Sequence, residues 1–204
     1  MRGNKMIPAH VEEKLRMFCE ETYEILRDKE QTVLKEKAQD GKVNLICTAQ
    51  GELLIFPLPE KHVFPYLDGE QKGTKACADK FVFKLDEESG TWDLHIVEFK
   101  KTIDTSVIGK SQWQFTMGIY NARAIAGFLG MKMKNVYLYS GFRNDKLAAN
   151  HALIALRANN NKEAITKIRQ WTEDRYELRV DGANKTFPHQ KIQLDSEGNG
   201  SILI

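Results

Sequence analysis

The sequence predicts an α/β fold with a mixed central sheet flanked by helices. Residues 80–85 and 92–101 alternate polar and apolar side chains around a turn-forming Asp-Glu-Glu-Ser-Gly-Thr segment, which is typical of a β-hairpin. A helical pattern over 109–131 then leads to an apolar strand over 134–140, and this spacing suits a β-α-β crossover between parallel strands. An antiparallel hairpin and a parallel crossover together make the sheet mixed.

Length and composition favour one intracellular domain over residues 1–204. A chain of 204 residues with 42% hydrophobic content can bury one sizeable core. The three cysteines, Cys19, Cys47 and Cys77, are widely spaced and form no C-x-x-C pair, which argues against a disulfide framework or a zinc knuckle. Because no apolar run approaches the roughly 18 residues of a membrane span and no signal peptide is evident, we expect a cytoplasmic protein without membrane contact.

The N-terminal third predicts a helix, a hairpin and a loop. Apolar side chains recur at helical spacing over 10–28, which indicates an amphipathic helix. The short runs 43–48 and 53–57 flank the Gly51 turn and are expected to pair with each other. Residues 59–73 are rich in proline, glycine and charge, and they predict a loop.

The second half predicts further helices and two late strands. Within the helix over 109–131, one apolar stripe is expected to pack on the sheet; its members are Trp113, Met117, Tyr120, Ala124 and Phe128. Beyond the strand over 134–140, the pattern indicates helices over 145–156 and 162–173. Strands are expected over 176–180 and 191–194.

A group of charged residues is predicted where the central hairpin ends. Residues two apart in a strand share a face, so Glu98 and Lys100 project together at the end of an apolar face. Ionised groups on such a face must be paired, bound to a ligand or close to solvent. If Leu85 pairs with Trp92 across the turn, the antiparallel register places Asp79 opposite Glu98.

This set of side chains suits the hydrolysis of phosphodiester bonds. Two neighbouring carboxylates repel each other, and a hard cation such as Mg²⁺ or Mn²⁺ relieves the repulsion by binding an oxygen of each. Such a metal polarises a phosphoryl oxygen and lowers the pKa of an attacking water. A lysine beside it orients that water or stabilises the developing negative charge.

These residues resemble the catalytic motif of the PD-(D/E)XK nuclease superfamily. Asp79 opens the first strand of the hairpin, Glu98 and Lys100 close the second, and the order strand, turn, strand, helix, strand over about 75–140 is similar to the family core. The usual proline before the aspartate is replaced by Ala78. The resemblance implies a restriction-endonuclease-like core, metal binding by Asp79 and Glu98, catalysis by Lys100, and cleavage of DNA.

The resemblance also points to residues outside the hairpin. Family members often add an acidic residue from an earlier helix, and Glu21 flanks the apolar stripe of the helix predicted over 10–28. A glutamine often follows on the helix after the lysine, where Gln112 and Gln114 are available. One branch of the family has a Gln-x-x-x-Tyr pattern, but the positions four after these glutamines hold Thr116 and Gly118.

The distribution of charge is compatible with a nucleic-acid partner, with DNA favoured over RNA. The net charge of +2 is small, so binding would depend on a local basic surface. Cleavage of both strands by so small a chain would suggest a homodimer. The middle of the chain carries most of the candidate phosphate contacts, which could equally be an ordinary solvated surface: Lys72, Lys75, Lys80, Lys84, Lys100, Lys101, Lys110, Arg123, Lys132 and Lys134.

Other interpretations remain open at this point. The hairpin could be an ordinary surface hairpin, and a nuclease fold could serve as a non-catalytic module for nucleic acid or protein in a defence or repair assembly. His95 lies on the strand face opposite Glu98 and is expected to be structural. Trp113, Phe115 and Tyr120 could stack on bases but are expected in the core, and Cys77 is expected to be a small buried hydrophobe.

Overall fold

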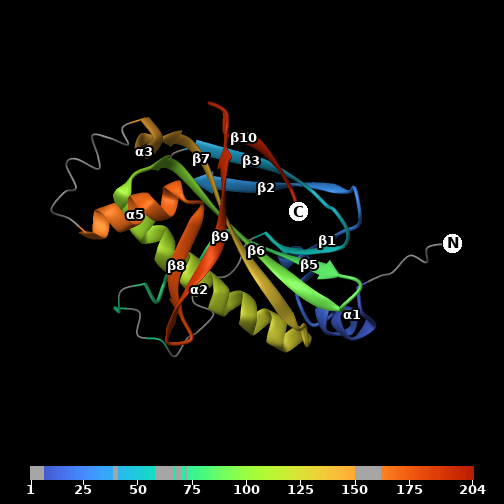
Figure 1. Ribbon diagram of the computed structural model, residues 1–204. Coiled ribbons are helices and arrows are strands. Elements are labelled where there is room, and N and C mark those ends of the chain that lie inside the picture. Colours follow the sequence, from blue (N-terminus) through green and yellow to red (C-terminus); the bar gives the residue numbers. More distant parts are fainter. Residues whose placement is uncertain (1–6, 39–40, 58–66, 68–69, 72, 150–161) are drawn as a thin grey trace.

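The structure is a computed structural model that describes residues 7–38, 41–57, 67, 70–71, 73–149 and 162–204 (Figure 1). The strands of its larger, seven-stranded sheet are, in order across the sheet, β1 (Glu24–Leu26), β4 (Leu53–Phe56), β5 (Lys80–Asp86), β6 (Thr91–Ile103), β7 (Met133–Asp145), β9 (Ala183–Gln193) and β8 (Arg175–Val180). A three-stranded sheet has the order β10 (Asn199–Leu203), β3 (Gly41–Thr48) and β2 (Gln31–Ala38). The helices are α1 (Ala9–Leu15), the 3₁₀ turn η1 (Glu20–Thr22), α2 (Thr105–Leu129), α3 (Lys146–Ala149) and α5 (Lys162–Thr172).

The mixed character of the large sheet confirms the prediction. β5 and β6 pair antiparallel, and Leu85 lies opposite Trp92 as expected. Helix α2 then crosses to β7, which pairs parallel to β6. A second parallel pair, β7 with β9, extends the sheet beyond the predicted crossover.

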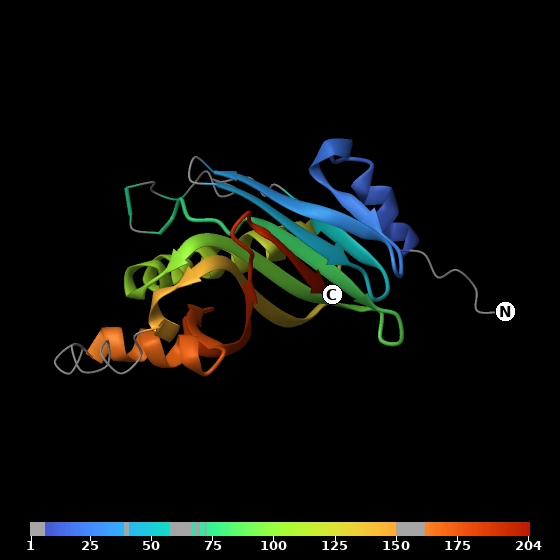
Figure 2. The same ribbon diagram turned by 90° about the horizontal axis from the view of Figure 1, so that it is seen from above.

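The two faces of the large sheet are covered by different structures. One hydrophobic cluster lies between the sheet and the helices and includes Leu15 of α1, Ile119 of α2 and Trp171 of α5. On the other face, Val82 and Val97 pack against the three-stranded sheet in a second cluster. Flanking helices therefore account for one face, and a small sheet covers the other. Figure 2 shows α1 and α5 at opposite ends of the molecule.

Helix α2 positions the side chains of interest and begins four residues before its predicted start. Asp104 caps its N-terminus, because the carboxylate accepts hydrogen bonds from the backbone N–H groups of Ser106 and Val107 at 2.9 and 3.0 Å. Gly130 ends the helix in the left-handed conformation, with φ of 75°. Its buried positions are Ile108, Ser111, Phe115, Gly118, Ile119, Asn121, Ala122, Ala126 and Leu129.

The predicted apolar stripe of this helix was wrong, because none of its five members is among the buried positions. Trp113 and Phe128 are 41% and 47% exposed, whereas Phe115, which was not placed on the stripe, is fully buried. Tyr120 is half-buried, and its hydroxyl accepts a hydrogen bond from the Asp181 N–H at 2.8 Å. The aromatic residues suggested one stripe, but the buried face of the helix consists of small residues, which allow close approach to the sheet, together with Phe115.

The long N-terminal helix was also wrong. Helix α1 ends at Leu15, and residues 24–26 instead form β1, which pairs with the edge of β4. Several of its apolar side chains still reach the core, and the ring of Phe18 packs against Phe56 and Phe128 at centroid distances of 5.7 and 5.6 Å. Strand pairing satisfies the backbone of this segment and overrides its helical periodicity.

The predicted hairpin of 43–48 with 53–57 did not form, although both strands exist. β3 pairs with β2 and β10, while β4 pairs with β1 and β5 in the other sheet. The two strands therefore lie in different layers of the fold, and Leu45 and Leu53 belong to the hydrophobic cluster between the two sheets. All four residues of β4 are buried, which is typical of a strand with neighbours on both edges.

The C-terminal predictions were confirmed in part. Helix α5 and strand β8 match their predicted ranges closely, and β9 begins well before residue 191. Of the helix predicted over 145–156, the structure describes α3, and residues 150–161 lie outside the described part. Most of the loop predicted over 59–73 lies outside it too. Within the described residues, no helix is long and apolar enough to cross a membrane.

Candidate functional site

Asp79 and Glu98 approach each other across the β5–β6 hairpin, as the predicted register requires. Lys80 pairs with Val97, so Asp79, one residue before β5, lies next to Glu98. The position of Asp79 is fixed by its Oδ2 atom, which accepts a hydrogen bond from the Phe99 N–H at 2.7 Å. The strand that carries Glu98 therefore also holds the second carboxylate in place.

Glu98 is a buried carboxylate with one free oxygen. The residue is 1% exposed, and its Oε2 atom has no hydrogen-bond partner among the described residues. Burial raises the pKa of Glu98 to about 8, and the negative charge of Asp79 adds to this, against the opposing influence of Lys100 and Gln114. The pKa of Asp79 is also raised by burial, opposed by its hydrogen bond from Phe99 and by Lys100. The site thus favours a positive charge between the two carboxylates.

Lys100 supplies one such charge at the edge of the cluster. Its ammonium group donates hydrogen bonds to Glu98 Oε1 and to Gln114 Oε1, the latter at 2.8 Å. The side chain of Lys100 is 18% exposed, whereas that of Glu98 is 1% exposed. The amine therefore lies on the solvent side of the buried carboxylate.

Close packing between α2 and the start of β5 brings Gln114 to this lysine. A Cβ atom added at Gly118 would lie 3.2 Å from the Ala78 Cβ and 3.4 Å from Phe81, so the helix approaches the sheet closely. The Gln114 amide also donates to the Cys77 carbonyl at 3.5 Å. Cys77 is buried as predicted. Helix, strand and the segment leading to Asp79 therefore meet at one point.

The structure separates the other candidates from this cluster. Glu21 is exposed on the 3₁₀ turn η1, because the helix on which it was placed ends at Leu15. Glu21 therefore does not flank the apolar stripe of a helix, and its catalytic role stays a prediction. Gln112 donates to the buried Gln170 at 3.0 Å, so Gln114 is the glutamine that reaches Lys100.

Two polar residues beside Glu98 were not found from the sequence. Ser140 of β7 pairs with Glu98 in the parallel register and is buried. Its hydroxyl lies 2.9 Å from Nε2 of His189, whose pKa burial lowers to about 3. No motif links these residues in sequence, because they come from β7 and β9, which only the sheet brings together. Ser140 and His189 therefore form a buried, neutral polar pair on the strands next to Glu98.

The face of the sheet opposite Glu98 holds structural polar residues. His95 contacts the Tyr139 hydroxyl at 2.8 Å and stacks on Tyr137, which agrees with its predicted structural role. Lys80 is fully buried there, with Nζ 3.5 Å from Glu36 Oε2. This lysine was expected among the phosphate contacts, but its burial between the two sheets removes it from that surface.

The rest of the basic surface is partly neutralised. Lys75 pairs with Glu70, Arg123 with Asp181 and Lys134 with Asp86. Three other lysines of the middle segment are exposed: Lys101, Lys110 and Lys132. A nucleic acid would therefore find fewer free cations than the sequence alone suggests.

The cluster fits a hard divalent cation held by two carboxylates. The donor atoms are oxygens, one of them buried and free. Burial and then the charge of Asp79 raise the pKa of Glu98, and a cation bound between the carboxylates would oppose both effects. Over the described part of the chain, no group of three or more His, Cys, Asp or Glu side chains could hold a metal ion. Magnesium often uses one or two carboxylates and takes its remaining ligands from water and substrate phosphate.

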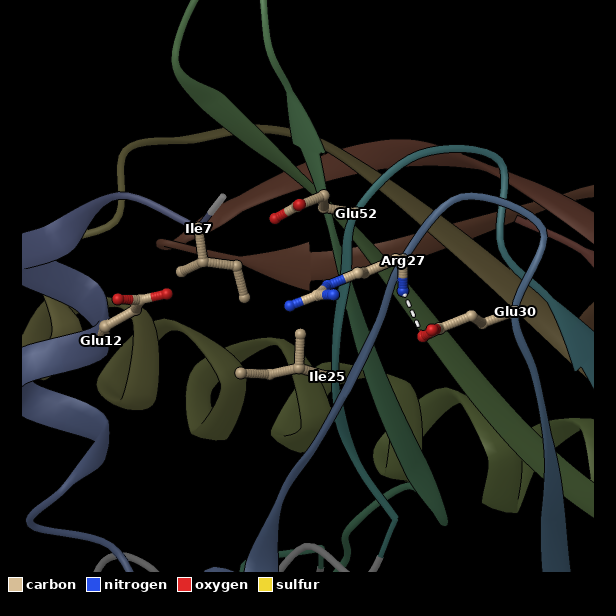
Figure 3. Close-up of a pocket in the computed structure, with 6 residues that line it drawn as sticks. All are labelled: Ile7, Glu12, Ile25, Arg27, Glu30 and Glu52. Atoms are coloured by element: carbon tan, nitrogen blue, oxygen red, sulfur yellow. Dashed lines mark hydrogen bonds between the residues drawn. The ribbon is translucent and has the colours of Figure 1, made fainter. Parts of the chain in front are cut away.

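A separate pocket of about 320 Å³ lies beside α1 and β1 (Figure 3). Glu12, Glu30 and Glu52 line it together with Arg27 and two isoleucines, and no residue of the Asp79–Glu98 cluster takes part. Burial raises the pKa of Glu52, and the charge of Arg27 opposes this shift. No lysine lines the pocket beside these carboxylates, so its side chains differ from the Asp, Glu and Lys set that suits phosphodiester hydrolysis.

Comparisons of the chain with models of protein families, with curated proteins and with solved structures found no match. The geometry of the Asp79–Glu98–Lys100 cluster is therefore the basis for inferring a function.

Proposed function

We propose that this protein is a divalent-metal-dependent nuclease that hydrolyses phosphodiester bonds, with DNA as the favoured substrate. The observation that carries the proposal is the juxtaposition of Asp79, Glu98 and Lys100, with a buried carboxylate oxygen of Glu98 left free. The order of β5, β6, α2 and β7 supports the resemblance to the PD-(D/E)XK core. A set of two carboxylates and one amine suits the charge changes of phosphoryl transfer.

Each side chain has a defined part in the proposed reaction. Asp79 and Glu98 would hold Mg²⁺ or Mn²⁺, which when bound supplies Lewis-acid activation of the phosphoryl group and of water. Asp79 keeps its orientation through the Phe99 N–H. Lys100 lies on the solvent side of Glu98, where its ammonium group can face a phosphate oxygen or an attacking water and stabilise developing negative charge.

Gln114 supports this arrangement by holding the lysine. Its side-chain oxygen accepts a hydrogen bond from Lys100, and its amide nitrogen reaches the Cys77 carbonyl. Because a lysine side chain has many rotamers, a second acceptor reduces the freedom that would have to be lost in the transition state. The amine is thereby oriented before substrate arrives.

Cleavage by purified wild-type protein and a Glu98→Gln variant tests the proposal. Plasmid, linear duplex and single strands are each incubated with Mg²⁺, Mn²⁺ or a chelator. We expect metal-dependent products from the wild type and none from the variant, whose side chain keeps its volume but cannot carry a negative charge. Salt-sensitive binding without any product would instead support a non-catalytic module that uses the nuclease fold.

A further inference from the structure

Trp113 is an exposed aromatic residue one position before the glutamine that holds Lys100. It is 41% exposed, whereas the other two tryptophans, Trp92 and Trp171, are 1% and 2% exposed. Tryptophan combines a large apolar ring with a polar N–H group, and exposed tryptophans are enriched where proteins contact their ligands. Its neighbour Gln114 ties this turn of α2 to the catalytic lysine.

The indole ring of Trp113 is held in place by the segment that leads to Asp79. Gly73 lies so close that an added Cβ atom would come within 2.3 Å of Cε3 and 2.6 Å of Cδ2 of the ring. Gly73 also has φ of +89°, a conformation that other residues rarely adopt. A residue with a Cβ atom would clash at position 73, so the backbone of Gly73 packs against the Trp113 indole where its two rings are fused. A held ring loses little entropy when a ligand stacks on it.

Positive charge accompanies the ring. Lys110 lies one turn earlier on α2, where residues three apart share a face, and it is exposed. Nucleobases stack on aromatic side chains while lysines contact the adjacent phosphates, a combination typical of proteins that bind single strands. Trp113 and Lys110 offer both contacts on the same side of one helix.

We propose that Trp113 is a stacking platform for an unpaired nucleobase of the strand whose phosphodiester reaches Lys100. The inference rests on the proposed nuclease function and names its substrate class: single-stranded nucleic acid, or a strand end that is locally unpaired. A base inside a duplex already stacks on its neighbours and would have to leave the helix to contact the indole. Duplex should therefore bind this platform less well than a single strand.

Tryptophan fluorescence tests the proposal directly, because the other two indoles are buried. The protein is titrated with a short oligothymidylate, and separately with a duplex, in the presence of a chelator so that no cleavage occurs. We expect the single strand to quench the emission more strongly than the duplex. The quenching should disappear in Trp113→Phe, while binding of a labelled oligomer, followed by anisotropy, persists.

Affinity measurements on matched variants complete the test. Trp113→Ala should weaken binding of the single strand roughly ten-fold, as expected when one stacked base is lost, and Trp113→Phe should weaken it less. Phe128→Ala serves as the control, since Phe128 is a similarly exposed aromatic residue about 22 Å further along the same helix. It should bind the oligomer as the wild type does.

The outcomes separate this inference from the proposed function. Unchanged emission at saturating oligomer, wild-type affinity of Trp113→Ala, or no binding of single strands would overturn the role of Trp113, even if duplex is cleaved. Quenching that depends on Trp113 without cleavage in any metal would uphold the platform and overturn the nuclease proposal.

Discussion

Lys100 Nζ donates a hydrogen bond to Gln114 Oε1 at 2.8 Å, which joins the end of the Glu-x-Lys strand to the first half of α2. The same glutamine reaches back to the Cys77 carbonyl, two residues before Asp79. One side chain thus connects the segments that carry all three proposed catalytic residues.

We expect Gln114→Ala to lower kcat about ten-fold with little change in KM, because Lys100 loses the acceptor that orients it while the substrate contacts remain. Steady-state cleavage kinetics measure the two constants. Gln112→Ala is the matched control, since Gln112 donates to Gln170 instead. Equal loss of activity in both variants would show that the glutamines act only through the stability of the helix.

Lys100→Ala should abolish most of the cleavage without unfolding the protein. Removal of a group that stabilises transition-state charge typically costs about 10²–10³ in kcat. The fold should persist because Glu98, whose pKa is already raised, can take up a proton when its cationic partner is lost. Lys101→Ala removes an exposed charge on the opposite strand face and should keep a kcat close to that of the wild type, because loss of a phosphate contact would change KM. Full activity of Lys100→Ala would rule out the mechanism.

The raised pKa of Glu98 predicts a stability that depends on pH. Between the ordinary value of 4.5 and about 8, the unfolded chain has released this proton while the folded protein retains it. In the absence of metal, the free energy of unfolding should therefore decrease as the pH rises through this window. Glu98→Gln cannot ionise, so the difference in stability between variant and wild type should grow towards alkaline pH. Urea denaturation at several pH values measures it, and a constant difference would contradict the buried, perturbed carboxylate.

Divalent cations should stabilise the protein more at alkaline than at acidic pH. Binding requires the ionised form of Glu98, so protons and metal compete for the same oxygens. Thermal unfolding with and without Mn²⁺ should show a rise in Tm that becomes larger as the pH approaches about 8. Asp79→Asn, which keeps an acceptor for the Phe99 N–H, should lose most of this rise. An equal rise in the variant would place the metal elsewhere.

Gly118→Val should separate α2 from the sheet and destabilise the fold. Its Cβ atom alone would lie 3.2 Å from the Ala78 Cβ, and the two methyl groups would overpack this contact at a cost of about 1–3 kcal/mol. Gly127 is the control, because a Cβ atom added there would meet nothing within 4 Å, and valine at this position should be nearly neutral. Chemical denaturation gives both free energies of unfolding. Similar values for the two variants would show that helix propensity, rather than close packing, governs Gly118.

The central hairpin and its polar end could be predicted from the sequence because both depend on local rules. Alternation fixes which residues share a face, and a short turn fixes the register, so Leu85 opposite Trp92 already brings Asp79 to Glu98. Lys100 follows from the same alternation. Gln114 was one of two candidates, and only its contact with the lysine distinguishes it from Gln112.

The errors lie where long-range pairing decides the structure. Helical periodicity over 10–28 yields to a strand at 24–26, because the edge of β4 offers hydrogen bonds that no local pattern records. The strands on either side of Gly51 enter different sheets for a similar reason, and Lys80 becomes buried because β2 and Glu36 cover it.

By itself, the sequence determined the α/β class, the β5–β6 register and the cluster of Asp79, Glu98 and Lys100, since each follows from the period of a strand and the length of a turn. Only the tertiary structure decided which residues surround that cluster. Ser140 lies opposite Glu98 on the next strand, Gln114 binds Lys100, and Trp113 is left exposed one position before Gln114, because separate strands and a helix pack at distances that no sequence interval encodes.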